Sequence, residues 1–487
     1  ISSTSINTIG GSVSTSGSSS DGSSEGDNQP IIVNGYVAKF FDRYYAPVLF
    51  HPVTKTIVLL AFLALFLAGI NLAPGVQLGL PQQVALPQDS YVISYFNQLA
   101  EYGRAGPPVY FIIKNGFNYT DETSQNLLCS VDAFPGGCRV DSLDNRFFIE
   151  TQMPDTSDVT DTTLSSWLDT YLIWLKPATG CCNQMANGTF CPVVLGQAFP
   201  PECKPCLSEA DFNEQGRPNA TTFMKFFTTW LGTTCNPQCG SCGSVFAMDI
   251  KLDTTKSPLS TEYIYSSRFR SFHRNLATQK DFISGLSESY ALTNKAHKDL
   301  KLEIIPYSVF YIFFEQYLYI ERVAAICIGL ALGAVFLVTL LLLGNLLASF
   351  MIIVLVFMIK VDLLGVMALW SINLNAVSVV NLVMAIGISV EFCVHLFHSY
   401  INHTGTTQHR ARIALVEMGS SVLKGITLTK FAGVLVLAFA HSEIFKVYYF
   451  RMFFTIVILG CLHGLVLLPT LLSMFGPSPR RRACSLW

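Results

Sequence analysis

The chain has 487 residues, of which 51% are hydrophobic and only 13% are charged, and its formal net charge at pH 7 is −2. Soluble domains usually carry about a quarter charged residues, so this composition indicates a membrane protein. Because the chain has no excess of basic residues, a nucleic-acid partner is not expected.

The N-terminal segment is dominated by Ser and Gly, as in GGSVSTSGSSSDGSSEG. Such a stretch cannot bury enough apolar surface to fold, so we predict that residues 1–44 form a disordered cytosolic linker. Since the chain starts at Ile1 without an initiator Met, we expect it to be the C-terminal part of a longer protein.

Six apolar stretches are each long enough, at about 1.5 Å of rise per residue, to cross the ~30 Å hydrocarbon core of a bilayer. They lie near residues 53–73, 323–344, 347–369, 376–398, 422–440 and 452–475. One stretch precedes a large polar segment and five follow it. We therefore predict a polytopic α-helical membrane protein with 1 + 5 transmembrane helices, which is a layout of transporters built from repeats.

This layout divides the chain into a first transmembrane helix at 45–73, a large domain at 74–320 and a five-helix bundle at 321–478. Basic residues flank the spans: Lys39 and Arg43 precede the first one, and the tail 479–487 contains three consecutive arginines. The positive-inside rule places both flanks, including this basic tail, in the cytosol. The large domain is therefore predicted to be luminal.

The large domain contains ten of the 14 cysteines, and an even number of clustered cysteines in an oxidising compartment indicates disulfides. The ten are Cys129, Cys138, Cys181, Cys182, Cys191, Cys203, Cys206, Cys235, Cys239 and Cys242. Cys181 and Cys182 should bond to different partners, because neighbouring residues seldom meet disulfide geometry. Two Cys-x-x-Cys pairs also fit a zinc site, but an oxidising lumen favours disulfides, so no metal or cofactor is expected.

Acceptor triplets for N-glycosylation occur in the same segment at Asn118, Asn187 and Asn219. A fourth triplet, at Asn402, falls in a predicted cytosolic loop and should stay unmodified. Sequon placement and cysteine usage thus agree with a luminal location.

The same segment has an α+β pattern with a cysteine-rich interruption. Strands are predicted at 76–80, 108–114, 244–252, 262–272 and 300–306, and helices at 89–103 and 277–296. The order β-α-β, insertion, β-β-α-β resembles a ferredoxin-like module that carries a disulfide-rich insertion near 117–243.

Ionisable residues inside membrane spans are functional candidates, because their burial in lipid costs several kcal/mol. Glu391 and His395 are spaced i, i+4 and share a helix face, and Gly387 one turn earlier allows a neighbouring helix to approach. Lys430 lies in the middle of the next span, so Glu391 is its natural partner. We predict a role in proton coupling for Glu391, His395 and Lys430; a static interhelical hydrogen bond is the alternative.

Lys360 and Asp362 are secondary candidates in the third span, "VFMIKVDLLGVMALW". They form either an ion pair that faces the bundle or a helix break near the luminal end. His463, in the last span, is expected to be a buried histidine with satisfied hydrogen bonds rather than a site.

Enzymatic chemistry finds no support in the motifs. The sequence has no GxxxxGK[ST] loop, HExxH or GxSxG motif, and no paired catalytic carboxylates stand out in the large domain. We therefore expect a protein that is not an enzyme.

Long stretches of the last spans resemble Niemann–Pick type C1 proteins: "NLNAVSVVNLVMAIGISVEFCVHLFHSY", "GSSVLKGITLTKFAGVLVLAFAHSEIFKVYYFRMFF" and "HGLVLLPTLLSMFGPS". The segment "QDSYVISYFNQLAEYGRAGPPVYFIIK" resembles their second luminal domain. The resemblance covers roughly residues 45–478. The wider group is the resistance–nodulation–division superfamily, which includes Patched and is built from two repeats of this layout.

The resemblance implies the C-terminal half of a transporter that moves sterol out of the late endosome, lysosome or fungal vacuole. Implied partners are sterol, membrane lipids, the N-terminal half of the same protein and a soluble sterol carrier of the Niemann–Pick type C2 kind, which docks mainly on the missing half. Glu391 and His395 match the family's "GISVEF" span, and Lys430 matches its "LTKF". The alternative is a Patched-like sterol-responsive receptor or scaffold without active transport.

Overall fold

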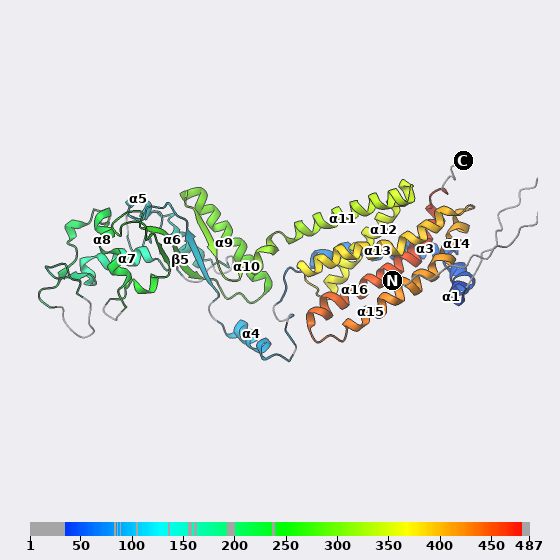
Figure 1. The fold of residues 1–487 in the computed structure, drawn as a ribbon, viewed down its shortest axis with the longest axis horizontal. Coiled ribbons are helices and arrows are strands. Elements are labelled where there is room, and N and C mark those ends of the chain that lie inside the picture. The colour runs from blue at the N-terminus through cyan, green and yellow to red at the C-terminus, as the bar shows by residue number, and fades with distance from the viewer. Residues whose placement is uncertain are drawn as a thin grey trace, which may run out of the picture.

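The computed structural model describes residues 35–479 except 82–83, 85, 88, 104–105, 135–136, 154–157, 160–162, 192–199 and 236–238. The predicted disordered linker over residues 1–34 and the basic tail from residue 480 onward lie outside the described residues. Figure 1 shows an elongated molecule, with a mixed α/β unit at one end and a bundle of long helices at the other.

Six helical segments of the bundle are long and apolar enough to cross a membrane, as predicted. They are Pro52–Gly75, Ile320–Leu343, Leu346–Leu369, Ala376–Asn402, Thr407–Leu437 and Phe445–Phe475. The first four correspond to α3 (Pro52–Leu72) with a short 3-10 turn, α11 (Ile320–Leu343), α12 (Leu346–Leu369) and α13 (Ala376–Asn402). Which side of the membrane each end faces stays a prediction.

The last two segments are built from several helical pieces. The fifth runs from α14 (Thr407–Ser421) through η8 (Val422–Leu428) into α15 (Thr429–Leu437), so it starts earlier than the apolar stretch alone indicated. The sixth runs through η9 (Phe445–Arg451), α16 (Met452–Leu462), η10 (His463–Leu467) and α17 (Leu468–Phe475).

The N-terminal end of the described chain is helical, which corrects part of the predicted disordered segment 1–44. Helix α1 (Tyr36–Phe40) is followed by η1 (Phe41–Tyr45) and α2 (Ala46–Leu49). Phe41 is buried, and Asp42 accepts a 2.8 Å hydrogen bond from Arg412 of α14. The Ser- and Gly-rich composition ends before these residues, and Phe41 has a surface to bury against.

Helices α3 and α12 approach each other closely at two glycines. A Cβ atom added at Gly365 would lie 2.9 Å from the Cα atom of Gly69, and one at Gly69 would lie 2.9 Å from the carbonyl oxygen of Val361. Small residues at such crossings let membrane helices pack backbone to backbone. The first span is therefore fastened against the rest of the bundle.

A four-stranded antiparallel sheet with the order β4-β5-β1-β6 organises the α/β unit, which residues 106–318 form. The strands are β1 (Pro108–Ile113), β4 (Ile250–Leu252), β5 (Ile264–Phe272) and β6 (Ile304–Tyr307), and helix α9 (Gln279–Leu300) connects β5 to β6. Buried side chains alternate along β1 and β5. The mixed α/β character is confirmed, whereas the ferredoxin-like assignment stays a prediction.

The predicted first strand at 76–80 is wrong. Leu78 instead forms an isolated bridge with Leu374, and the Leu374 amide donates to the Gln77 carbonyl at 2.7 Å. The backbone of this short run pairs with the end of the helical bundle rather than with the sheet. The helix predicted at 89–103 forms as α4 (Tyr91–Tyr102), and Figure 1 shows it on the connection between the bundle and the α/β unit.

The cysteine-rich insertion between β1 and β4 is mainly helical. It contains α5 (Glu122–Gln125), α6 (Leu143–Thr151), α7 (Trp167–Leu175), α8 (Ala220–Leu231) and the two-stranded β2–β3 ribbon at Asn183–Gln184 and Lys204–Pro205. Its core is aromatic: Trp167, Tyr171, Phe227 and Trp230 are fully buried. These rings belong to the same hydrophobic core as Phe111 and Phe269 of the sheet, and the division of the chain into domains stays a prediction.

All ten predicted cysteines are joined in five disulfides. The pairs are Cys129–Cys138, Cys181–Cys239, Cys182–Cys206, Cys191–Cys203 and Cys235–Cys242. Adjacent Cys181 and Cys182 do bond to different partners. Both Cys-x-x-Cys pairs are consumed, so their thiolates are not available to a metal.

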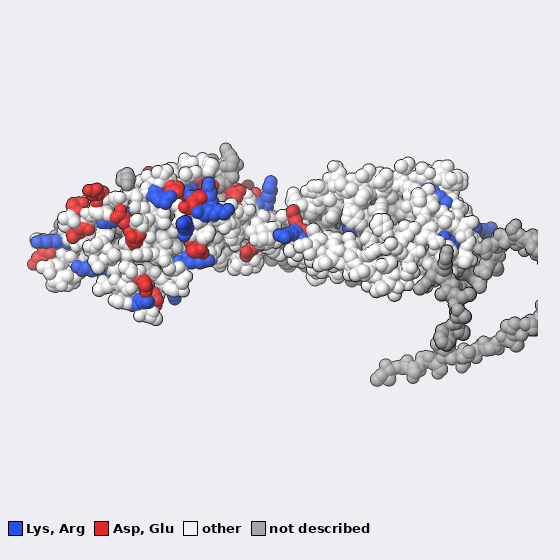
Figure 2. All heavy atoms as spheres, turned by 90° about the horizontal axis from the view of Figure 1, so that it is seen from above, with Lys and Arg blue, Asp and Glu red and all other residues white. Residues whose placement is uncertain are grey.

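Aromatic packing within the α/β unit holds the segment that leads into the bundle against α9. Phe282 of α9 contacts Phe310 and Phe314 at ring-centroid distances of 5.0 Å each, and Phe314 ends the short helix α10 (Tyr311–Phe314). The 3-10 turn η7 (Glu315–Leu318) then leads into α11. Figure 2 shows charged side chains gathered over the α/β unit, while most of the visible bundle surface carries none.

Candidate functional site

An ion pair joins two helices of the bundle at the predicted position. Lys430 of α15 donates to Glu391 Oε2 of α13, and the Lys430 ammonium also lies 5.7 Å from the centre of the Phe392 ring. The Glu391 side chain is 42% exposed and the Lys430 side chain 28% exposed in this chain. The pair thus lies at the surface of the bundle, where it can be reached from outside.

One stripe of α13 is open along its length. A Cβ atom added at Gly387 would meet nothing within 4 Å, and Glu391 and His395 follow it at intervals of four residues. His395 is exposed, and the structure shows no hydrogen bond between His395 and Glu391, both of which it describes. The structure therefore brings together Glu391 and Lys430 but leaves His395 one turn away.

A second polar pair is fully buried inside the bundle. His463 Nε2 lies 3.2 Å from Asp362 Oδ2, and neither side chain is exposed. The other ring nitrogen, Nδ1, lies 2.9 Å from the Leu459 carbonyl, and the Phe62 ring meets the imidazole edge-on at 4.7 Å. Because a carbonyl only accepts, Nδ1 carries a hydrogen, and Nε2 is the ring nitrogen that faces the carboxylate.

Both predictions for Lys360 and Asp362 are wrong. Helix α12 is unbroken across them, and residues two apart on a helix point to different sides, so they do not pair with each other. Lys360 is 2% exposed, and its ammonium has no hydrogen-bond partner within the described part of the chain. Asp362 instead faces His463. From the sequence alone, His463 is expected to be an ordinary buried histidine. A single sequence does not reveal a contact between residues that lie about 100 positions apart.

Sequence reasoning also missed the role of Arg410. Its guanidinium is 2% exposed, donates to the Tyr400 hydroxyl at 2.7 Å and to the Pro477 carbonyl at 2.8 Å, and stacks over the Tyr400 ring. Arg410 therefore ties α13, α14 and the end of α17 together. Its position supports the structure of the bundle rather than its chemistry.

The three predicted glycosylation sites are exposed on the α/β unit, as modification requires. Asn118 and Asn187 lie in turns, and Asn219 caps α8 by accepting from the Thr222 amide at 2.8 Å. Their modification stays a prediction. Among the residues that the structure describes, no group of three metal-ligating side chains is present.

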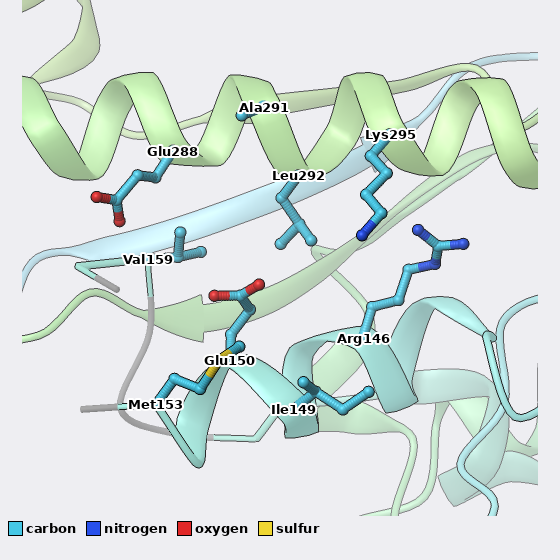
Figure 3. Close-up of a pocket in the computed structure, with 9 residues that line it drawn as sticks. All are labelled: Arg146, Ile149, Glu150, Met153, Val159, Glu288, Ala291, Leu292 and Lys295. Carbon is cyan, nitrogen blue, oxygen red and sulfur yellow. The ribbon is translucent and has the colours of Figure 1, made fainter. Parts of the chain in front are cut away.

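A cavity of 360 Å³ lies between α6 and α9 of the α/β unit. Figure 3 shows the Lys295 and Arg146 cations at one end, the Glu150 and Glu288 carboxylates towards the other, and Leu292 between them. This cavity is therefore amphipathic, and no sequence pattern predicted it.

Three curated relatives show what the chain is similar to. It is 40% identical over 450 residues to "NPC intracellular cholesterol transporter 1" of Sus scrofa, a match that covers 90% of this chain and 34% of the relative. It is 38% identical over 460 residues to "NPC intracellular cholesterol transporter 1 homolog 1b" of Drosophila melanogaster, covering 93% of this chain and 36% of the relative. It is 26% identical over 472 residues to "Protein patched homolog 1" of Danio rerio, covering 91% and 37%.

The chain thus spans about a third of the length of the curated relatives that it matches. No family model matches it. The relatives are therefore longer proteins, of which this chain corresponds to one part.

Proposed function

We propose that this chain, a homologue of NPC intracellular cholesterol transporter 1 proteins over 90% of its length, is the C-terminal half of an intracellular sterol transporter. The proposal rests on the names of the homologues and on a membrane bundle that contains ionisable groups. In it, the α/β unit is a luminal domain and the bundle lies in a membrane of the endolysosomal system.

The observation that carries a transport mechanism is the Glu391–Lys430 ion pair between α13 and α15. In a medium of low dielectric constant the two opposite charges stabilise each other, and protonation of Glu391 leaves the Lys430 ammonium without its counter-ion. The unpaired cation then destabilises the packing of α13 against α15. Proton uptake at Glu391 is thereby coupled to a movement of these two helices.

The open stripe of α13 gives this mechanism a second component. Gly387 and His395 are exposed and Glu391 between them is partly exposed, and in this proposal the rest of the transporter covers them. Covering Glu391 removes water from its carboxyl group. The difference in free energy between the ionised and the protonated state of Glu391 then becomes larger. Sterol enters as the cargo, delivered by a soluble carrier that docks mainly on the other half.

The competing function is a sterol-responsive receptor or scaffold, which the 26% identity to a Patched protein favours. Glu391→Gln in the full-length protein distinguishes the two, with clearance of stored sterol measured in cells that lack the endogenous protein. Glu417→Gln is the matched control, since Glu417 lies on α14, bonded to Ser399. We expect Glu391→Gln to block clearance at normal abundance and location; normal clearance would favour the receptor.

A further inference from the structure

Two buried carboxylates meet at the first turns of neighbouring helices in the α/β unit. Asp144 lies at the start of α6 and Asp169 at the start of α7, and they are 8% and 6% exposed. Ser130 connects them: its amide donates to Asp169 Oδ2 at 3.0 Å, and its hydroxyl donates to Asp144. The Ser166 side chain also hydrogen-bonds to Asp169, and the other carboxylate oxygen, Oδ1, is buried without a resolved hydrogen-bond partner among the described residues.

Ser130 belongs to the loop that the Cys129–Cys138 disulfide closes, whose described residues 129–134, 137 and 138 are here named the clasp loop. Besides the Ser130 contacts, the Ser142 hydroxyl donates to the Cys129 carbonyl at 2.8 Å. The clasp loop is thus fastened to the N-termini of α6 and α7 mainly through oxygen atoms whose charge depends on protonation.

One buried cation faces this carboxylate pair. Arg217 is 2% exposed and attracts Asp169, but the hydrogen bonds that its guanidinium makes to described residues run from Nη2 to Asn126 and to the two sulfur atoms of the clasp-loop disulfide. Its Nε and Nη1 atoms have no partner in the described part of the chain. One cation balances one carboxylate, so the pair is neutralised only when it also holds one proton.

The remaining charges around the pair do not change this count. Asp132 is exposed and repels charge on Asp144, while Lys176 attracts Glu209 as well as Asp169. Glu122 attracts Arg217 from the side of α5. The two carboxylates and Arg217 are the most buried of these charged groups.

We propose that Asp144 and Asp169 form a proton-binding site, and that uptake of one proton in an acidic lumen fastens the clasp loop to α6 and α7. At neutral pH the second negative charge is buried without a counter-ion, and the Ser130 bridge holds two mutually repelling anions. Once the first proton is bound, the pair carries a single charge that Arg217 balances. The site acts independently of the Glu391–Lys430 pair and of the direction of sterol movement.

The pKa values of the two carboxyl groups support proton uptake in acid. Burial raises the pKa of Asp144 to about 6, and burial together with the charge of Asp144 raises the pKa of Asp169 to about 7. Both values lie above the ordinary value of 3.8, so the folded state binds more protons than the unfolded state between these limits. Stability contributed by the pair is therefore present in acid and is lost as pH rises through these values.

Thermal unfolding of the whole chain in detergent tests the site. Tryptophan fluorescence reports on the α/β unit, because Trp167, Trp174 and Trp230 all lie in its core. Each variant is compared with wild type at about pH 7.5 and about pH 5, which cancels other titrations that the two share. Asp169→Asn supplies a neutral side chain that still accepts from Ser130, and Asp253→Asn is the control at an exposed turn.

Relative to wild type, we expect Asp169→Asn to be more stable at neutral pH and to lose this advantage in acid, a change in melting-temperature difference on the order of 5 °C. Asp253→Asn should follow wild type at both pH values. Equal pH dependence in all three proteins would overturn the proposal.

Hydrogen exchange on the wild-type chain gives a second test that needs no variant. After correction for the intrinsic effect of pH on exchange, amides of residues 127–144 should exchange more slowly in acid, while those of α9 should not. Exchange in the clasp loop that is independent of pH would refute an acid-fastened loop even if the variants fail to fold.

Discussion

His273 is a buried imidazole that the fold keeps neutral. The effect of replacing it on the pH dependence of stability can be calculated. The imidazole is fully buried between β5, α9 and α10; Nδ1 lies 3.1 Å from the Asp158 carbonyl and Nε2 lies 2.9 Å from the Tyr311 hydroxyl. The carbonyl requires a hydrogen on Nδ1, so Nε2 accepts from Tyr311. Burial lowers the pKa of His273 to about 4 from 6.5.

The sign of the pH effect follows from these two values. Below 6.5 the unfolded chain binds a proton that the folded chain does not bind until about 4, so stability falls as pH falls through this window. At about pH 5 the loss amounts to about 2 kcal/mol, and at about pH 7.5 it is close to zero. His273 therefore opposes the carboxylate pair of Asp144 and Asp169.

His273→Gln removes the titration and keeps a donor for Asp158 and an acceptor for Tyr311. We expect the free energy of unfolding of the variant, relative to wild type, to rise by about 2 kcal/mol between about pH 7.5 and about pH 5. Denaturant titration followed by tryptophan fluorescence measures it. His297→Gln is the control, since His297 is half-exposed beside Glu303. A relative stability of His273→Gln that does not change with pH would refute the reasoning.

Three further changes test the packing and the pairings. Gly365→Leu should push α12 away from α3 and lower the yield of folded, monodisperse protein in detergent. Lys430→Met should destabilise the bundle more than the same change combined with Glu391→Gln, because the single variant leaves a carboxylate unpaired; thermal unfolding of the two measures the difference. Cys181→Ser with Cys239→Ser opens a bond between residues 58 apart in sequence and should cost about 2–5 kcal/mol, seen as unfolding at lower denaturant.

The six membrane helices were predictable because their signal is local: an apolar run of sufficient length identifies a span whatever it packs against. The disulfides were predictable as a set, since ten clustered cysteines in one segment imply pairing, but their connectivity depends on the fold. The Glu391–Lys430 contact followed from the cost of a cation in lipid, which leaves few possible partners.

Other features depend on contacts that one sequence does not encode locally. The Asp362–His463 pair joins helices distant in the chain, so Asp362 was paired with its near neighbour Lys360 instead. The run at 76–80 alternates like a strand but finds its partner at Leu374, in the bundle. The carboxylate pair of the α/β unit escaped notice because Asp144 and Asp169 are ordinary helix-start residues until the fold buries both.

Sterol movement by the full-length protein in proteoliposomes tests the central claim most directly, with the rate measured with and without an inward-acidic pH gradient. The account predicts that the gradient accelerates transfer by wild type and by Glu417→Gln but has no effect on Glu391→Gln. Transfer by Glu391→Gln that equals wild type and responds equally to the gradient would contradict it.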